Sequence, residues 1–221
     1  MVIQVNGEVF FNIYIYIMNT DIFINKRILF YGPAQTLDKQ YINVNNYDYV
    51  IITNNLITLF FDKYKLNQQC KIIHLSNHLY TLNYIENLKR NEKKIELFLF
   101  IDIPSFNNAK KYIACEKLFL LPSNYNVITK KIPLCLPRIL NFLEKSNFKE
   151  LYITGCTFYK ENKIEDCYEE NYMVKEGKKH NVFSNDSKKH DIQDNINYVK
   201  DICENNKNII LCKELQQRLY E

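Results

Sequence analysis

The four histidines of this chain are side chains that can act as acids or bases near neutral pH. His180 and His190 fall in or beside a long polar segment, just ahead of an amphipathic stretch, where a histidine can serve as a general base. The alternative interpretation of both histidines is a solvated side chain with no role in catalysis. His74 lies inside an apolar run, which favours a structural role, whereas His78 follows that run and could contact a ligand.

Residues 26–55 have the order of elements that builds a nucleotide crevice in an α/β sheet. An apolar run of strand length, 28–31, ends at Gly32, and a second buried-looking run, 49–53, ends at Asn54. Glycine lets a backbone approach a ligand closely, and an asparagine amide offers a base or ribose both a donor and an acceptor. A plain turn followed by a polar loop is the alternative, because a single glycine is a weaker signal than G-x-G-x-x-G.

A second glycine, Gly155, marks the end of another apolar run, 151–154, and Tyr159 lies just beyond it. A phenol at this edge of a sheet can donate a hydrogen bond to a departing phosphate without a metal. The sequence contains neither a D-x-D pair, which would hold a metal with a diphosphate, nor a G-x-x-x-x-G-K-[ST] loop. We therefore expect neither a metal-dependent sugar-diphosphate enzyme nor a P-loop NTPase.

The length and composition predict one globular domain, or one domain with a small subdomain. Hydrophobic residues make up 47% of the 221 positions, which is enough for a substantial core. The net charge of +4 is small, and lysine and arginine are spread along the chain, so we expect no nucleic-acid partner. The seven cysteines are odd in number and form no C-x-x-C pair, so we expect a reducing compartment, no disulfide framework and no zinc site.

The first 25 residues precede the regular pattern and allow two interpretations. They form either a hairpin around Asn6-Gly7 or an extension upstream of the α/β domain at 26–221. The apolar stretch 9–18 is too short to span a bilayer and lacks the basic start and cleavage site of a signal peptide. We therefore expect a cytoplasmic protein, with a peripheral membrane contact by this stretch left open.

Apolar runs alternate with helical patterns from residue 26 onward. The expected strands are 27–31, 48–53, 70–75, 95–101, 151–154 and 208–212, with a further short run at 117–121. The expected helical segments are 55–66, 78–92, 105–114, 133–147, 191–205 and the C-terminus, and 160–188 is a long charged loop. The alternation predicts a single Rossmann-like α/β domain, with a mostly parallel sheet flanked by helices and a lid-like loop.

Two of these stretches resemble a known family. The turn 32–34, G-P-A, followed by Leu37, is similar to a turn of the form G-x-G-P-S-L. The segment 148–159, F-K-E-L-Y-I-T-G-C-T-F-Y, is similar to Y-K-E-I-Y-L-S-G-x-D-F-Y. Both motifs are typical of the CMP-sialic-acid-dependent sialyltransferases, especially the bacterial lipooligosaccharide type, and the resemblance covers residues 26–215.

The resemblance implies a metal-independent, inverting transfer of sialic acid or a related sugar from a CMP-activated donor to a glycan or glycolipid acceptor. His180 or, as the less favoured choice, His190 would take the proton of the acceptor hydroxyl. Tyr159 would stabilise the leaving CMP phosphate, together with Tyr168 or Tyr172, while the long loop would fold over the donor. The resemblance implies no cofactor beyond the donor, and it leaves a homo-oligomer open.

The expected donor-binding positions come from this resemblance and from polar residues at strand ends. Asn54 matches an asparagine that ends the family's second strand and contacts the nucleotide. The full set is Gly32, Pro33, Ala34, Asn54, Ser76, Asn77, Cys135, Gly155, Thr157 and Tyr168.

The chain also departs from the family pattern. The sequence 134–136, L-C-L, stands where the family has a T-S-G-like turn that meets the donor, Tyr31 replaces an asparagine, and Thr157 replaces an aspartate. Alignment without gaps places Asp186, rather than a histidine, at the position of the family's catalytic base. The alternative hypothesis is therefore a catalytically degenerate relative that binds a nucleotide or a partner, and a different nucleotide-dependent transferase on the same sheet architecture is a third.

Overall fold

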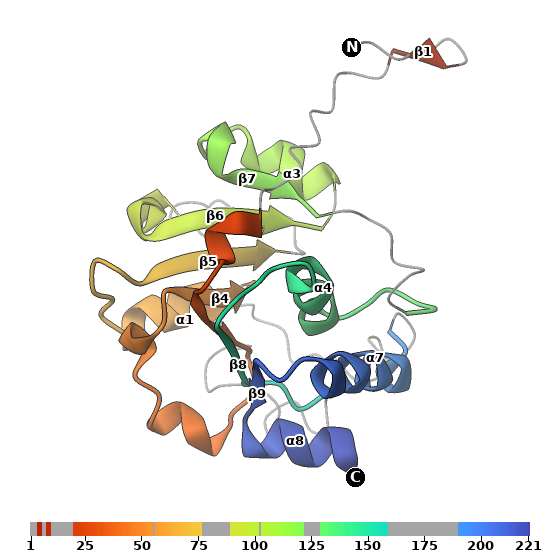
Figure 1. The fold of residues 1–221 in the computed structure, drawn as a ribbon. Helices are drawn as coiled ribbons and strands as arrows, with labels where there is room; N and C mark the ends of the chain where they lie inside the picture. The colour runs from red at the N-terminus through yellow and green to blue at the C-terminus, as the bar shows by residue number, and fades with distance from the viewer. Residues whose placement is uncertain are drawn as a thin grey trace, which may run out of the picture.

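β3 (Arg27–Tyr31) is the strand around which the sheet is arranged, with β4 (Tyr49–Thr53) on one side and β8 (Glu150–Thr154) on the other. The computed structural model describes residues 4–5, 8–9, 20–54, 56–76, 89–101, 103–121, 129–158 and 190–221. Within them the sheet has the order β7-β6-β5-β4-β3-β8-β9, and all its neighbouring strands are parallel (Figure 1). Its other strands are β5 (Lys71–Ser76), β6 (Ile95–Phe100), β7 (Leu118–Leu120) and β9 (Ile209–Leu211).

The path of the chain reverses beside β3. It moves outward from β3 through β4, β5, β6 and β7, and then returns to add β8 and β9 on the opposite side of β3. In an open α/β sheet, ligands bind outside the carboxyl ends of the strands at such a reversal. The boundary between β3 and β8 is therefore the expected place for a site. The predicted single α/β domain of Rossmann-like type is confirmed.

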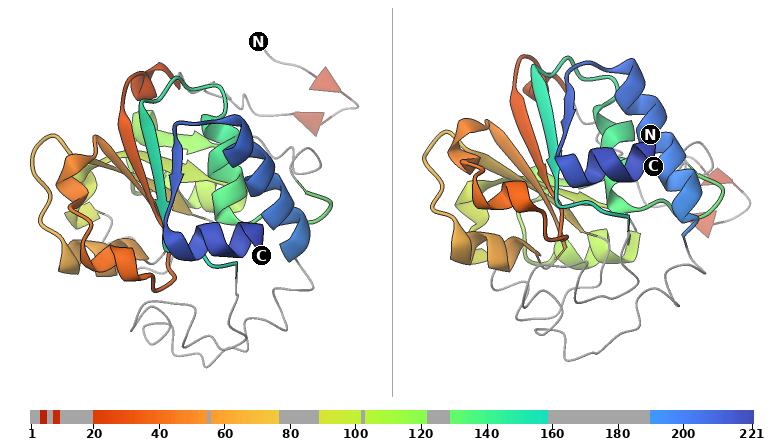
Figure 2. Two further views of the ribbon diagram at one scale, coloured as in Figure 1. Left: turned by 60° about the horizontal axis from the view of Figure 1, so that its bottom comes forward. Right: turned by 90° about the horizontal axis from the view of Figure 1, so that it is seen from below.

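Helices cover both faces of the sheet (Figure 2). One face carries α4 (Cys135–Leu143), α7 (Ile192–Asn205) and α8 (Lys213–Tyr220), and the other carries α1 (Leu56–Lys63) and α3 (Ile103–Ala109). Along β3 the side chains alternate between the two layers, with Ile28 and Phe30 in the first and Leu29 and Tyr31 in the second. Burial on both faces explains why the central strands are continuous apolar runs in the sequence.

Ion pairs at the amino edge of the sheet favour a single register for β3. Arg27 Nη2 lies 3.0 Å from Glu150 Oε1 on β8, and the Arg27 backbone N–H donates to Asp48 Oδ2 over 2.8 Å. Lys26 Nζ lies 3.3 Å from Asp48 Oδ1. A shift of one residue would break these contacts and turn every side chain of β3 to the other face. These charged residues therefore have a structural role.

The predicted elements are found with modest changes at their ends. α3 begins at Ile103 rather than at 105 and ends at Ala109, because the next residues form turns. Pro137 lies in the first turn of α4, where a missing N–H is tolerated. β1 (Gln4–Val5) and β2 (Glu8–Val9) pair antiparallel, and the predicted turn at residues 6–7 lies outside the described residues. Most of the predicted helical segment 78–92 and the whole of the predicted loop 160–188 lie outside the described residues.

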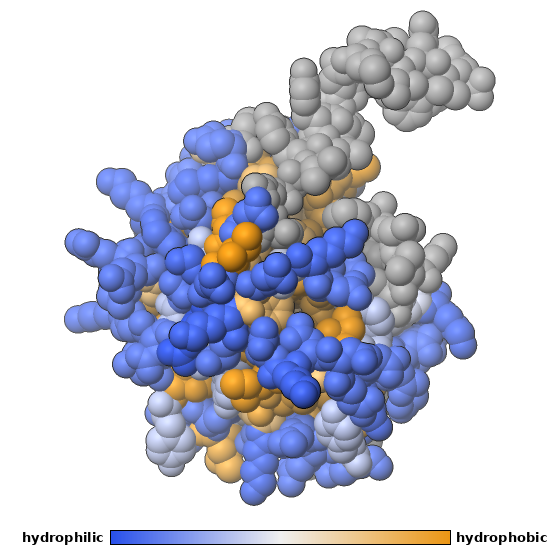
Figure 3. Space-filling model, viewed as in Figure 1, coloured by the Kyte–Doolittle hydropathy of each residue, from blue (hydrophilic) through white to orange (hydrophobic). Residues whose placement is uncertain are grey.

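The surface shown in Figure 3 is mainly hydrophilic, with apolar residues visible between the polar ones. Among the exposed large apolar side chains in the described part of the chain, Leu37 and Tyr41 lie at the two ends of one short 3₁₀ helix, 37–40, whereas Ile103, Ile210 and Tyr220 come from α3, β9 and α8. None of the helices that the structure describes has both the length and the apolar character required to cross a membrane.

Candidate functional site

The turns that follow β3 and β8 are packed against each other at the carboxyl edge of the sheet. Gly32 donates its backbone N–H to Thr154 O over 2.9 Å, and Ala34 donates to Gly155 O over 2.8 Å. A Cβ atom on either glycine would overlap the carbonyl oxygen of the other. Gly155 also has a φ of +69°, which favours glycine. The space beside each glycine is therefore filled by the backbone of the opposite turn.

A short 3₁₀ helix, η2 (Leu37–Gln40), joins the first turn to β8 through side chains. Asp38 accepts a hydrogen bond at Oδ2 from the hydroxyl of Tyr152 and another at Oδ1 from the hydroxyl of Thr154, each over 2.9 Å. Because Thr154 donates to Asp38, Thr36 donates to Thr154 Oγ1 over 2.8 Å. Burial, followed by the hydrogen bond to Asp38, raises the pKa of Tyr152, so this phenol stays a neutral donor.

Lys39 brings a cation to the same boundary. Its Nζ donates to Gly32 O over 2.6 Å and lies 4.0 Å from the centroid of the Tyr31 ring, and the residue is only 4% exposed. A buried ammonium group is stable only with polar or aromatic partners of this kind. Positive charge at this position is complementary to an anionic ligand.

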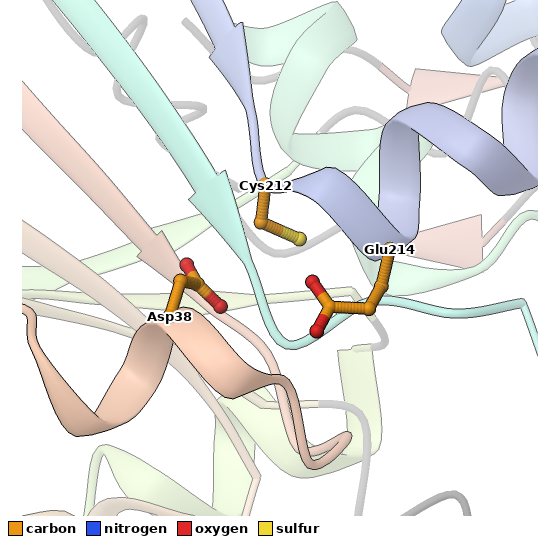
Figure 4. Close-up of side chains that lie close together, drawn as sticks. All are labelled: Asp38, Cys212 and Glu214. Atoms are coloured by element: carbon orange, nitrogen blue, oxygen red, sulfur yellow. The ribbon is translucent and has the colours of Figure 1, made fainter.

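Asp38, Cys212 and Glu214 converge beside this network (Figure 4). One oxygen or sulfur atom of each lies within 4.8 Å of the others, and carboxylates and thiolates can hold a divalent cation. Both oxygens of Asp38 already accept hydrogen bonds, however, and Glu214 Oε1 accepts one from Leu37 N over 2.8 Å. Burial raises the pKa of the Cys212 thiol to about 11, so it is protonated near neutral pH, whereas a metal needs the thiolate. We interpret this cluster as a polar contact that ties η2 to the start of α8.

Asn54, at the end of β4, has a left-handed backbone with a φ of +50°. Its N–H donates to Leu75 O over 2.9 Å, and its carbonyl oxygen lies 3.1 Å from His74 Nε2. Complete burial lowers the pKa of His74 to about 4, so its ring is neutral at physiological pH. His74 is thus a buried residue, as its place in an apolar run predicts, and it contacts a predicted site residue.

Phe158 is another non-glycine residue with a left-handed backbone at this edge, with a φ of +48°. A bulky side chain rarely adopts this conformation, and such strain is common at functional sites. The side chain is buried in the core on the face of the sheet that carries α4, α7 and α8, which holds the turn in place. The next residue, Tyr159, lies outside the described residues.

α4 and α7 both begin at the level of the carboxyl edge, because each precedes a parallel strand. The backbone N–H of Leu134, just before α4, donates to Asn195 Oδ1 on α7 over 2.8 Å. His190 Nδ1 lies 2.5 Å from Ile132 O. Since a carbonyl oxygen only accepts, Nδ1 is the donor in this contact, which leaves Nε2 as the ring nitrogen that could accept a proton from a substrate.

Comparisons of the chain with models of protein families, with curated proteins and with solved structures find no match. The resemblance to sialyltransferases therefore stays a hypothesis, to be weighed against the geometry of the carboxyl edge.

The structure describes most of the predicted donor-binding positions. Those on the two turns in contact are Gly32, Pro33, Ala34, Gly155 and Thr157, whereas Asn54 follows β4, Ser76 ends β5 and Cys135 begins α4. The predicted residues that lie outside the described part of the chain are Asn77, His78, Tyr159, Tyr168, Tyr172 and His180. A role in binding or catalysis stays a prediction for all of them.

Sequence reasoning did not single out the charged residues beside the two turns. Asp38 and Lys39 belong to a polar segment directly after a strand-ending glycine, which was an available signal. Glu214 gave no such signal, because its contact with Leu37 joins residues 177 positions apart. Only the order of the strands brings these segments together.

Proposed function

We propose that this chain is a metal-independent, inverting glycosyltransferase that takes sialic acid or a related sugar from a CMP-activated donor. The observation that carries the proposal is the contact between the turns at Gly32 and Gly155. These turns belong to the two stretches that resemble the sialyltransferases, and they meet where the strand order reverses. Sheets of this kind bind nucleotides at that position.

Groups around this boundary support a donor that carries a phosphate. The Lys39 ammonium group lies 2.6 Å from Gly32 O and supplies positive charge there. Asn54 ends the neighbouring strand and offers an amide to the nucleotide. The strained turn at Phe158 precedes Tyr159, whose phenol we propose as the donor of a hydrogen bond to the leaving phosphate.

His190 or His180 acts as the general base in this proposal. The acceptor hydroxyl oxygen attacks the anomeric carbon, its proton passes to the imidazole, and the bond from that carbon to the phosphate oxygen breaks. CMP leaves with the electron pair of that bond. The hydrogen bond from His190 Nδ1 to Ile132 O supports His190, because it leaves Nε2 able to accept the proton.

The acceptor that we propose is a glycan or glycolipid, as in the family that the chain resembles. We also propose a cytoplasmic location. The free thiols of Cys70, Cys135, Cys156, Cys203 and Cys212 in the described residues fit a reducing compartment.

A relative that binds the nucleotide without catalysis is the second candidate. The start of α4 favours it, because the residue before the helix is Leu134, with no side-chain capping bond, and the first helical residue is Cys135. A serine or threonine hydroxyl, which could hold the donor there, is absent from positions 134–136.

A thermal-shift titration with CMP, UDP, GDP and NAD, first without and then with Mg²⁺, tests the proposal. A ligand that binds only the folded state raises its apparent stability. We expect stabilisation by CMP that Mg²⁺ does not change, and release of CMP from a CMP-activated sialic acid in the presence of a glycan acceptor. CMP binding without turnover supports the second candidate. Indifference to CMP, or a response only to a diphosphate with Mg²⁺, contradicts both.

A further inference from the structure

We propose that His74 is a positioning residue of the donor site, which holds the turn at Asn54 in the conformation that binds the nucleotide. The inference rests on the proposed function, because it names a residue that prepares the same site for its donor. It stands on the hydrogen bond between the His74 ring and the Asn54 backbone, which joins the ends of β5 and β4.

The backbone of Asn54 is held from three directions. Its N–H donates to Leu75 O over 2.9 Å, and its carbonyl oxygen accepts from Ile57 N over 3.4 Å and from His74 Nε2 over 3.1 Å. The contact with Ile57 is long, so the imidazole supplies the better hydrogen bond. The φ of Asn54 is +50°, a left-handed conformation that asparagine tolerates better than most residues, and these contacts hold the turn in it. The backbone conformation in turn sets the direction in which the asparagine side chain leaves the strand.

The state of the His74 ring is fixed by its surroundings. The ring is fully buried and packs edge-on against Phe98, with the ring centroids 6.1 Å apart. Since the Asn54 carbonyl only accepts, Nε2 must carry the proton. Burial also keeps the ring neutral at physiological pH. One tautomer in one orientation therefore holds the turn.

An apolar residue would fill this position of β5 without the penalty of burying a polar ring. The residues on either side, Ile73 and Leu75, are apolar and buried. The hydrogen bond to Asn54 is a contact that histidine adds here and that an apolar residue could not make. A purely structural role would affect only the stability of the fold, whereas a positioning role would affect the affinity for CMP as well.

Two variants separate these roles. His74→Phe keeps an aromatic ring but has no donor, and His74→Gln keeps an N–H donor. With CMP binding measured by calorimetry well below each melting temperature, we expect His74→Phe to raise the Kd about tenfold. We expect His74→Gln to restore affinity to within about twofold of the wild type. Ile72→Val, on the same strand and face, is the control that weakens the core and leaves the Kd unchanged.

A double-mutant cycle with Asn54→Gly shows whether the effect passes through Asn54. Glycine adopts a positive φ readily but has no amide side chain, so His74→Phe should not weaken CMP binding further in that background. If a folded His74→Phe binds CMP as tightly as the wild type, this inference is wrong, while the proposed function still stands. The same conclusion follows if His74→Phe weakens CMP binding as much in the Asn54→Gly background as it does in the wild type. A wild type that binds no CMP overturns the proposed function and this inference with it.

NMR of the wild type keeps the test decisive if His74→Phe does not fold. A long-range proton–nitrogen spectrum should show His74 as the Nε2–H tautomer, with resonances that shift when CMP is added. The opposite tautomer, or resonances that CMP leaves unchanged, overturns the inference.

Discussion

Gly32 and Gly155 lie so close that the carbonyl oxygen of each occupies the space in which the other would carry a Cβ atom. The contact joins β3 to β8 at the point where the strand order reverses. It therefore makes the geometry of the proposed site depend on two residues that have no side chains.

Alanine at either glycine should destabilise the fold. We expect a loss of about 2 kcal/mol for Gly32→Ala from steric overlap, and about 3 kcal/mol or more for Gly155→Ala, because its φ of +69° adds backbone strain. Urea unfolding measures both. Gln35→Ala, exposed in the same turn, is the control and should change the free energy of unfolding by less than about 0.5 kcal/mol. Equal stability of Gly155→Ala and the wild type would contradict the close contact.

The buried His74 should make stability depend on pH. Its pKa is about 4 in the folded chain, against an ordinary 6.5, so between these values the unfolded chain binds a proton that the folded chain does not. The free energy of unfolding should therefore rise with pH across this window, by about 3 kcal/mol at most, with the full contribution present above pH 6.5. Urea unfolding at a series of pH values should show a shallower rise for His74→Gln than for the wild type. Parallel curves would mean that His74 does not titrate in this way.

Asp38 should matter more to stability than Glu214, its neighbour in the polar cluster. Asp38 accepts hydrogen bonds from the hydroxyls of Tyr152 and Thr154, whereas Glu214 accepts one from an exposed backbone N–H. We expect Asp38→Ala to lower the free energy of unfolding by about 3 kcal/mol and Glu214→Ala by about 1 kcal/mol. Chemical denaturation of the two variants side by side measures this difference. A larger loss of stability for Glu214→Ala than for Asp38→Ala would show that the contact with α8 stabilises the fold more than the contact with β8 does.

The two candidate bases can be separated by mutation. His190→Gln should lower kcat about 100-fold or more if His190 takes the acceptor proton, while CMP affinity stays close to that of the wild type. His180→Gln is the matched comparison. Loss of kcat in the His180 variant alone would assign the base to His180, and loss in neither would remove both from the mechanism.

The apolar runs of the sequence predict the strands because both faces of each central strand are buried. Ile28 to Tyr31 and Leu151 to Thr154 are therefore recognised as strands, and the glycines that end them are recognised as turns. That these two strands are neighbours does not follow from the apolar pattern, because nothing local specifies which strand pairs with β3.

Several side-chain contacts of the site also cannot be predicted from the local sequence pattern. Lysine side chains are usually solvated, yet Lys39 is buried. Its ammonium group donates a hydrogen bond to Gly32 O and packs over the Tyr31 ring. His74 is recognisable as buried from its apolar neighbours, but its bond to Asn54 depends on the pairing of β4 with β5. Such contacts become visible only when the order and register of the strands are known.

The position of β8 beside β3 has a consequence for how the protein is made. Arg27 and Glu150, which pair across this boundary, are 123 residues apart in the sequence. Closing a loop of that length is slow compared with forming local contacts, so the β3–β8 pair should be among the last parts of the sheet to assemble. As the ribosome releases the chain, the segment up to β7 can begin to fold while the proposed site is still incomplete. Competence to bind a nucleotide at this boundary would then mark the completion of folding.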